Sequence, residues 1–256
     1  MEIRLSGIVG IVGNYGSGKT EVSINLAVNR KRAGLDVRLA DLDLVNPYFR
    51  TREARVQLEA LGIDMVLPPE MYMQADLPVL SPVVAGMIKK NVGLTLLDLG
   101  GDDVGARVLA ALADAFKDLQ VHLLQVVNPM RPQTSNIEGC LKIRQEIEKA
   151  AKLQITGLIG NANLINETDA DEIYSGYEFV RKLSDQSGLP LEFITVASEI
   201  LPGVELSRFS CPVLTIVRQL VPPWLKAGEF GKTEDRGQMT EDRGQRTEAG
   251  SRKKRR

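Results

Sequence analysis

The sequence predicts an α/β fold of three layers, in which a mainly parallel central sheet is flanked by helices. Strand-length apolar runs alternate with helical patterns along residues 1–225, which is typical of stacked βαβ units. Most of these runs are almost continuously apolar, as at 93–98, and this suits strands that helices cover on both faces. A chain of 256 residues with 43% hydrophobic content can bury a substantial core.

The individual elements follow from length and periodicity. The expected strands lie at 7–12, 36–41, 63–67, 93–98, 120–127, 154–160, 191–196 and 212–217. The expected helices lie at 19–33, 51–61, 80–90, 103–116, 134–151 and 169–187. The fifth helix is the clearest, because Ile137, Leu141 and Ile147 fall largely on one side and charged residues on the other.

Charge divides the chain into two parts. Its 32 basic and 33 acidic residues give a net charge of −1, but residues 226–256 hold ten bases and six acids, so that the tail is +4 and the body −5. A seven-residue repeat in the tail, 233–238 and 240–245, has no apolar seam and predicts disorder. We therefore expect a folded domain over 1–225 and a disordered charged repeat tail over 226–256, with the five terminal bases as a solvated end rather than a nucleic-acid site.

Cysteine and histidine are too few for several chemistries. Cys140 and Cys211 lie far apart in sequence and His122 is the only histidine, so neither a zinc cluster nor a disulfide framework is expected. His122 lies in an expected buried strand, which argues against a Ser-His-Asp triad. Neither a signal peptide nor a membrane span is evident. These observations favour a cytoplasmic protein.

The most specific motif is Gly13-Asn14-Tyr15-Gly16-Ser17-Gly18-Lys19-Thr20, a Walker A phosphate loop between the first expected strand and helix. Its glycines and backbone N–H groups suit a phosphate chain, and Lys19 places a full charge at the terminal phosphates. Thr20 is expected to bind Mg²⁺ through its hydroxyl. We count Glu21, in the first helical turn, with the nucleotide-binding residues Gly13, Asn14, Tyr15, Gly16, Ser17, Gly18, Lys19 and Thr20. The domain over 1–225 is therefore expected to be a P-loop nucleotide-binding domain.

Acidic residues end two further strands. Asp41 and Asp43 follow the second strand, so one is expected to act at Mg²⁺ and the other to orient the attacking water. Asp98 ends an apolar strand as a Walker B acid does and is expected on the Mg²⁺ side. Gly101, or Gly100 beside it, is expected to present an N–H to the γ-phosphate as part of a nucleotide-sensitive switch.

Base recognition is predicted less directly. Asn161 follows a later strand and is a candidate for a hydrogen bond to a purine edge, the alternative being that it only ties down its loop. Guanine-specific enzymes of this architecture use Asn-Lys-x-Asp, and Leu164 stands here where the Asp would be. Adenine is favoured.

These motifs, together with Asn128-Pro129 after the central strand, resemble the CobQ/CobB/MinD/ParA group of P-loop ATPases. That group belongs to the signal-recognition, MinD and BioD (SIMIBI) class, and the resemblance covers about residues 5–220. It implies Mg·ATP binding and slow hydrolysis, with Asp43 matching the water-activating Asp and Asp41 the acid before it. MinD-like and ParA-like members carry a signature lysine where this chain has Asn14, so a homodimer is possible but its ATP-sandwich mechanism is in doubt.

We therefore expect an ATP-dependent switch or maturation-type ATPase with Lys19 and Asp43 as catalytic residues and Thr20, Asp41 and Asp98 at Mg²⁺. Its partner is expected to be a protein; a membrane is not expected, because the C-terminal sequence lacks an amphipathic helix. The alternatives are an ATP-dependent ligase or amidotransferase acting on a small carboxylic acid and an ATP-sensing module without useful hydrolysis. A metallochaperone GTPase ranks last, since metal-binding His and Cys segments are absent. The irregular segment 68–78 is a candidate contact for the partner or substrate.

Overall fold

A computed structural model describes residues 1–43, 54–66, 82–90, 93–101, 105, 108–110, 112–117, 119–221 and 224–231. Two sequence predictions lie outside these residues: the contact role of the segment 68–78, and the disorder of the repeat and basic end of the tail.

Eight strands within the described residues form one parallel sheet. They are β1 (Gly7–Val12), β2 (Val37–Leu42), β3 (Asp64–Val66), β4 (Leu94–Leu99), β5 (Val121–Val127), β6 (Gly157–Gly160), β7 (Leu191–Ala197) and β8 (Val213–Ile216). Their order across the sheet is β3-β2-β4-β1-β5-β6-β7-β8. The predicted parallel sheet is confirmed, and each expected strand is present with small shifts at its ends.

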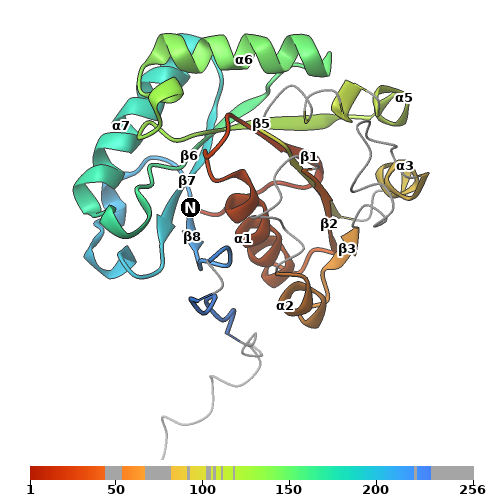
Figure 1. Ribbon diagram of the computed structural model, residues 1–256, viewed down its shortest axis with the longest axis horizontal. Coiled ribbons are helices and arrows are strands. Elements are labelled where there is room, and N and C mark those ends of the chain that lie inside the picture. The colour runs from red at the N-terminus through yellow and green to blue at the C-terminus, as the bar shows by residue number, and fades with distance from the viewer. Residues whose placement is uncertain are drawn as a thin grey trace, which may run out of the picture.

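Helices cover both faces of the sheet (Figure 1). They are α1 (Lys19–Arg32), α2 (Arg55–Ala60), α3 (Pro82–Lys89), α5 (Ala113–Phe116), α6 (Ile137–Ala151) and α7 (Ala170–Ser187). One face packs against α1 and α2, and the other packs against α3, α5, α6 and α7. The alternation along β1 decides the faces, because Val9 and Ile11 join the first core and Ile8 and Val12 the second. The three-layer α/β fold that the sequence predicts is therefore confirmed.

Parallel pairing brings the strand ends with functional residues to one edge of the sheet. β1 lies between β4 and β5, and β2 lies on the far side of β4. In this register Asp41 on β2 is the direct partner of Asp98 on β4. The phosphate loop leaves β1 at the same edge, since all the strands run in one direction.

The chain beyond β8 returns along α1, and its blue segment runs below that helix in Figure 1. The Glu21 carboxylate accepts the backbone N–H of Gln219 and of Leu220, and the Asn25 amide bonds both backbone groups of Val217. Further along, Arg32 donates to the carbonyl of Gly231. Described residues on both sides of the predicted domain boundary at 225, namely 217–220 and Gly231, therefore contact α1.

Replacing Glu21 with alanine should lower the free energy of unfolding by about 2 kcal/mol, because two backbone N–H groups in a part-buried region lose a charged acceptor. Burial raises the pKa of the Glu21 carboxyl, and the two N–H donors lower it in part. Urea unfolding at pH 7 measures the loss. Glu138→Ala is the matched control, since Glu138 also lies in a first helical turn but is exposed. Equal stability of the two variants would show that the contact of Glu21 with 219–220 contributes nothing.

Within the part of the chain that the structure describes, none of the helices combines the length and the apolar character needed to traverse a bilayer.

Candidate functional site

The phosphate loop joins β1 to α1 in a conformation that only glycine tolerates at its two ends. Gly13 has φ +149°, and a Cβ there would lie 2.6 Å from the carbonyl oxygen of Val126 on β5. Gly18, the N-cap of α1, has φ +91°, and a Cβ there would overlap the amide of Asn161. Neither contact has room for a side chain, so the glycines allow the loop to lie directly on β5 and on the residue after β6.

Two hydrogen-bond donors of the loop converge on one oxygen atom. The Lys19 ammonium lies 3.1 Å from the carbonyl oxygen of Asn14, and the backbone N–H of Ser17 donates to the same oxygen at an N···O distance of 3.2 Å. Lys19 is only 6% exposed. In this conformation the Asn14 carbonyl occupies both donors. A buried ammonium beside a helix N-terminus is nevertheless a group that suits a phosphate oxygen.

The side chains of Asn14 and Tyr15 differ in their placement. Asn14 is buried, and its amide donates to the carbonyl of Tyr15. This side chain stays within its own loop and carries no charge. Tyr15 is largely exposed, so the loop tip contributes its backbone rather than its phenol ring to the interior.

The predicted carboxylates lie together beside α1. Asp41 and Asp98 are fully buried on adjacent strands. Asp98 accepts a hydrogen bond of 3.1 Å from the Ser23 hydroxyl on α1. Ser23 is one helical turn beyond Thr20 and shares its side of the helix, so Asp98 and Thr20 face the same region. Asp41 accepts the backbone N–H of Asp43 at 3.2 Å, which fixes the start of the chain that leaves β2.

The donor set suits Mg²⁺ in the P-loop arrangement. Oxygen ligands are what this ion prefers, and proteins commonly hold it through one or two carboxylates together with substrate phosphates. Thr20 supplies a hydroxyl, and Asp41 and Asp98 supply carboxylates from buried positions. No group of three or more His, Cys, Asp and Glu side chains gathers among the described residues as a ready-made metal cage. The residues therefore fit an ion that arrives with a nucleotide.

Gly101 lies against the phosphate loop. A Cβ on Gly101 would be 2.5 Å from the Lys19 ammonium and 2.9 Å from the backbone nitrogen of Tyr15. Any side chain at this position would displace Lys19 or the loop. Glu21, by contrast, turns away to the segment after β8, so the structure places its carboxylate with Gln219 and Leu220 rather than at the loop.

Asn161 connects the phosphate loop to two strands. Its amide nitrogen donates to the carbonyl of Ser17 at 2.6 Å, and its amide oxygen accepts the Thr195 hydroxyl of β7 at 2.5 Å. The side chain is only 4% exposed. Of the two interpretations that the sequence leaves open, these bonds support the one in which Asn161 ties down a loop, and the loop is the phosphate loop.

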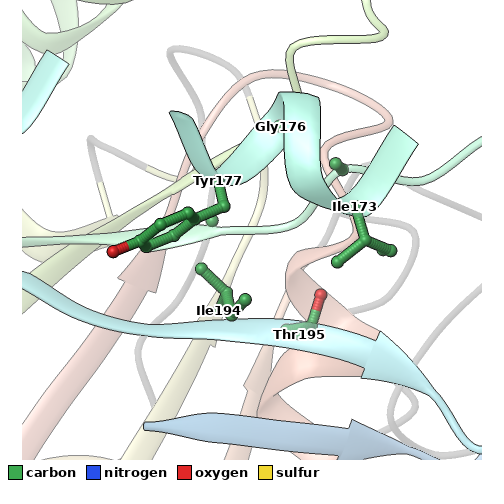
Figure 2. A pocket seen from close by; sticks show the side chains of 7 residues that line it. Ile173, Gly176, Tyr177, Ile194 and Thr195 are labelled. Atoms are coloured by element: carbon green, nitrogen blue, oxygen red, sulfur yellow. The ribbon is translucent and has the colours of Figure 1, made fainter. Parts of the chain in front are cut away.

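Helix α7 supports Asn161 from the outside. Gly176 of α7 packs so closely on Ala162 that a Cβ would overlap the Ala162 side chain. Figure 2 shows Gly176 on α7 above β7, with Thr195 pointing from the strand towards the helix. The space between α7 and β7 at this point does not admit a water molecule, so it is a packing gap and not a ligand site.

Sequence reasoning missed three contributors, namely Ser23, Thr195 and Arg131. Arg131, in the turn after β5, donates through Nε to the carbonyl of Gly16 at 3.0 Å. Ser23 lies inside helix α1 and Thr195 inside strand β7. Neither residue is part of a recognisable sequence motif. Arg131 comes shortly after the Asn128-Pro129 motif, and this position in the sequence was the one available signal that it lies near the site.

No protein-family model matches the sequence, and no curated protein matches it either. The comparison with solved structures found several FtsY proteins, and two of them have TM-scores of 0.50 or more. The cell division protein FtsY of Thermotoga maritima is 21% identical with a TM-score of 0.50, over 74% of this chain and 62% of that one. Chloroplast FtsY of Physcomitrella patens is 19% identical with a TM-score of 0.52, over 73% of this chain and 58% of that one. The signal recognition particle receptor FtsY of Elizabethkingia anophelis, in complex with GDP, is 20% identical with a TM-score of 0.49, over 77% and 58%.

This chain thus spans about three-fifths of the length of these FtsY structures. Identities near 20% establish the fold and not the activity. The assignment to the CobQ/CobB/MinD/ParA group stays a prediction. The phosphate-loop sequence after β1, the parallel strand order and the FtsY structures of Thermotoga maritima and Physcomitrella patens together show that the chain has a three-layer α/β P-loop NTPase fold.

Proposed function

We propose that this chain binds Mg·ATP, hydrolyses it slowly and uses the two nucleotide states to control a protein partner. The observation that carries this proposal is the buried Lys19 ammonium at the N-terminus of α1, directly after a glycine-rich loop. Buried carboxylates lie beside the loop at the same edge of the sheet. P-loop hydrolases combine this fold with a phosphate loop and with acidic residues that follow the loop in the sequence.

Each side chain then has a defined task. Lys19 and the loop N–H groups bind the phosphates and stabilise the charge that develops on the transferred phosphoryl group. Thr20 and Asp98 hold Mg²⁺, directly or through water, with Asp41 beside them. The ion, when bound, neutralises phosphate charge. Asp43, whose backbone Asp41 fixes, orients the attacking water.

The choice of ATP over GTP rests on Leu164. An aspartate at this position would accept the N1–H and amino group of guanine, and an apolar side chain cannot do so. Leu164 is exposed in the loop after β6. Titration of the wild-type chain with Mg·ATP and Mg·GTP tests this part directly, and tighter binding of GTP would overturn it.

The hydrolytic role is tested with Asp43→Ala. This variant should bind Mg·ATP as the wild type does, but its hydrolysis rate should fall about 100-fold, because the attacking water loses its orienting carboxylate. Single-turnover hydrolysis and equilibrium titration measure the two quantities separately.

The matched control is Asp185→Ala, which removes an exposed carboxylate from α7 and should change neither quantity. Normal hydrolysis by Asp43→Ala would show that the catalytic assignment is wrong. Hydrolysis at background level in the wild type, with intact affinity, would instead favour an ATP-sensing module.

A further inference from the structure

Arg131 lies against the outside of the phosphate loop. Its Nε donates to the carbonyl oxygen of Gly16 at 3.0 Å. A Cβ built on Gly16 would be 3.5 Å from Nε and 3.7 Å from the guanidinium carbon, so the planar group lies beside this residue. The contact joins residues 115 positions apart in sequence.

The turn that carries Arg131 is held in place by a buried asparagine. Asn128 is 1% exposed, and its side-chain oxygen accepts the N–H of Met130 while its amide donates to the carbonyl of Asn163. Its carbonyl oxygen accepts the Thr134 hydroxyl and the Arg131 N–H. These hydrogen bonds hold the backbone of the turn in place. The Arg131 side chain therefore extends to the phosphate loop from a fixed position.

Two successive peptide groups of the loop are thereby anchored through their carbonyl oxygens. Arg131 binds the carbonyl of Gly16, and Asn161 binds the carbonyl of Ser17. In a trans peptide the N–H points opposite to the C=O. Anchoring both oxygens fixes the direction of the N–H groups of Ser17 and Gly18, and the Ser17 N–H is held by the carbonyl oxygen of Asn14 inside the loop.

We propose that Arg131 is a positioning residue for the phosphate loop, which holds the Gly16–Ser17 peptide in the orientation that gives the loop its shape. This inference rests on the proposed function. Because the shape of the loop serves binding of the phosphate chain as a whole, the contribution of Arg131 is the same in the ground state and the transition state. Loss of Arg131 should therefore raise KM and leave kcat nearly unchanged.

The test compares Arg131→Met, Arg131→Lys and the wild type with Mg·ADP and Mg·ATP as ligands. Methionine keeps a long stem without the donor, and the dissociation constants for both nucleotides should rise about tenfold together. KM should rise by the same factor with kcat within about twofold. Lysine restores a cationic donor and should recover part of the affinity. Arg181→Met is the control, since Arg181 is an exposed arginine paired with Glu178 on α7.

The outcomes separate the alternatives. Unchanged affinity in Arg131→Met, with tight binding by the wild type, would overturn the role of Arg131 and leave the proposed function standing. A loss confined to kcat or to ATP would also overturn it, because the guanidinium would then act on the transferred phosphate. A merely structural lesion would reduce the active fraction without changing KM. Absence of nucleotide binding by the wild type would overturn the proposed function and this inference together.

Discussion

Lys19→Ala should lower the affinity for Mg·ATP by at least about a hundredfold, because it removes a buried charge aimed at the phosphate site. Lys19 is held by the carbonyl of Asn14 and is nearly inaccessible to solvent, so its ammonium is already oriented before any ligand arrives. Such preorganisation makes the loss large, since no other described side chain of the loop carries a positive charge. Calorimetric titration with Mg·ATP measures the effect.

Folding must be checked in the same variant. Removing an ammonium from a buried position relieves a desolvation cost, so the melting temperature without nucleotide should not fall substantially. Lys182→Ala, at an exposed position on α7, is the control and should bind as the wild type does. If Lys19→Ala stays folded and binds Mg·ATP normally, Gly13–Thr20 is not the phosphate site.

Asn161→Ala should lower the free energy of unfolding by about 3 kcal/mol, because two hydrogen bonds in a buried region lose their common partner. The Ser17 carbonyl and the Thr195 hydroxyl would then lack the bonds that join them through the amide. Since the Ser17 carbonyl is an anchor of the phosphate loop, affinity for nucleotide should fall as well. Denaturant unfolding and nucleotide titration measure the two losses.

The base dependence of this loss tests what Asn161 does. If the Asn161 amide anchors the loop, Asn161→Ala should lower the affinities for Mg·ATP and Mg·GTP by the same factor. If the amide binds the base, only the affinity for the preferred nucleotide should fall. Asn166→Ala is the control, because Asn166 is an exposed asparagine of the same connecting segment. A base-selective loss with unchanged stability would restore the base-reading interpretation.

Much of the fold could be predicted because the signals are local. Continuous apolar runs mark β1, β4 and β5, and the periodic pattern over 137–151 marks α6. The boundaries were less exact. The strand expected from residue 154 begins at Gly157. The helix expected from residue 134 begins at Ile137, because Thr134 belongs to a separate 3₁₀ turn, Pro132–Thr134. Helix and strand ends depend on capping and pairing partners that the local pattern does not contain.

The candidate site was predictable to the extent that it consists of motifs at strand ends. Gly13–Thr20, Asp41, Asp98 and Gly101 are brought together because parallel strands deliver their carboxyl ends to one edge. The role of a side chain at that edge was harder to predict. Asn161 follows its strand as expected, but the direction of its amide depends on Thr195, a residue on another strand.

The sequence by itself determined the three-layer parallel fold and the phosphate loop, since both follow from periodicity and from residue types at fixed spacing. Only the tertiary structure decided which side chains hold that loop. Glu21 belongs by sequence to the phosphate motif, yet its carboxylate binds the chain after β8, and Arg131 belongs to no motif, yet it binds Gly16. Hydrogen bonds between residues more than a hundred positions apart depend on how the strands are ordered, and that order is settled by packing of the whole sheet.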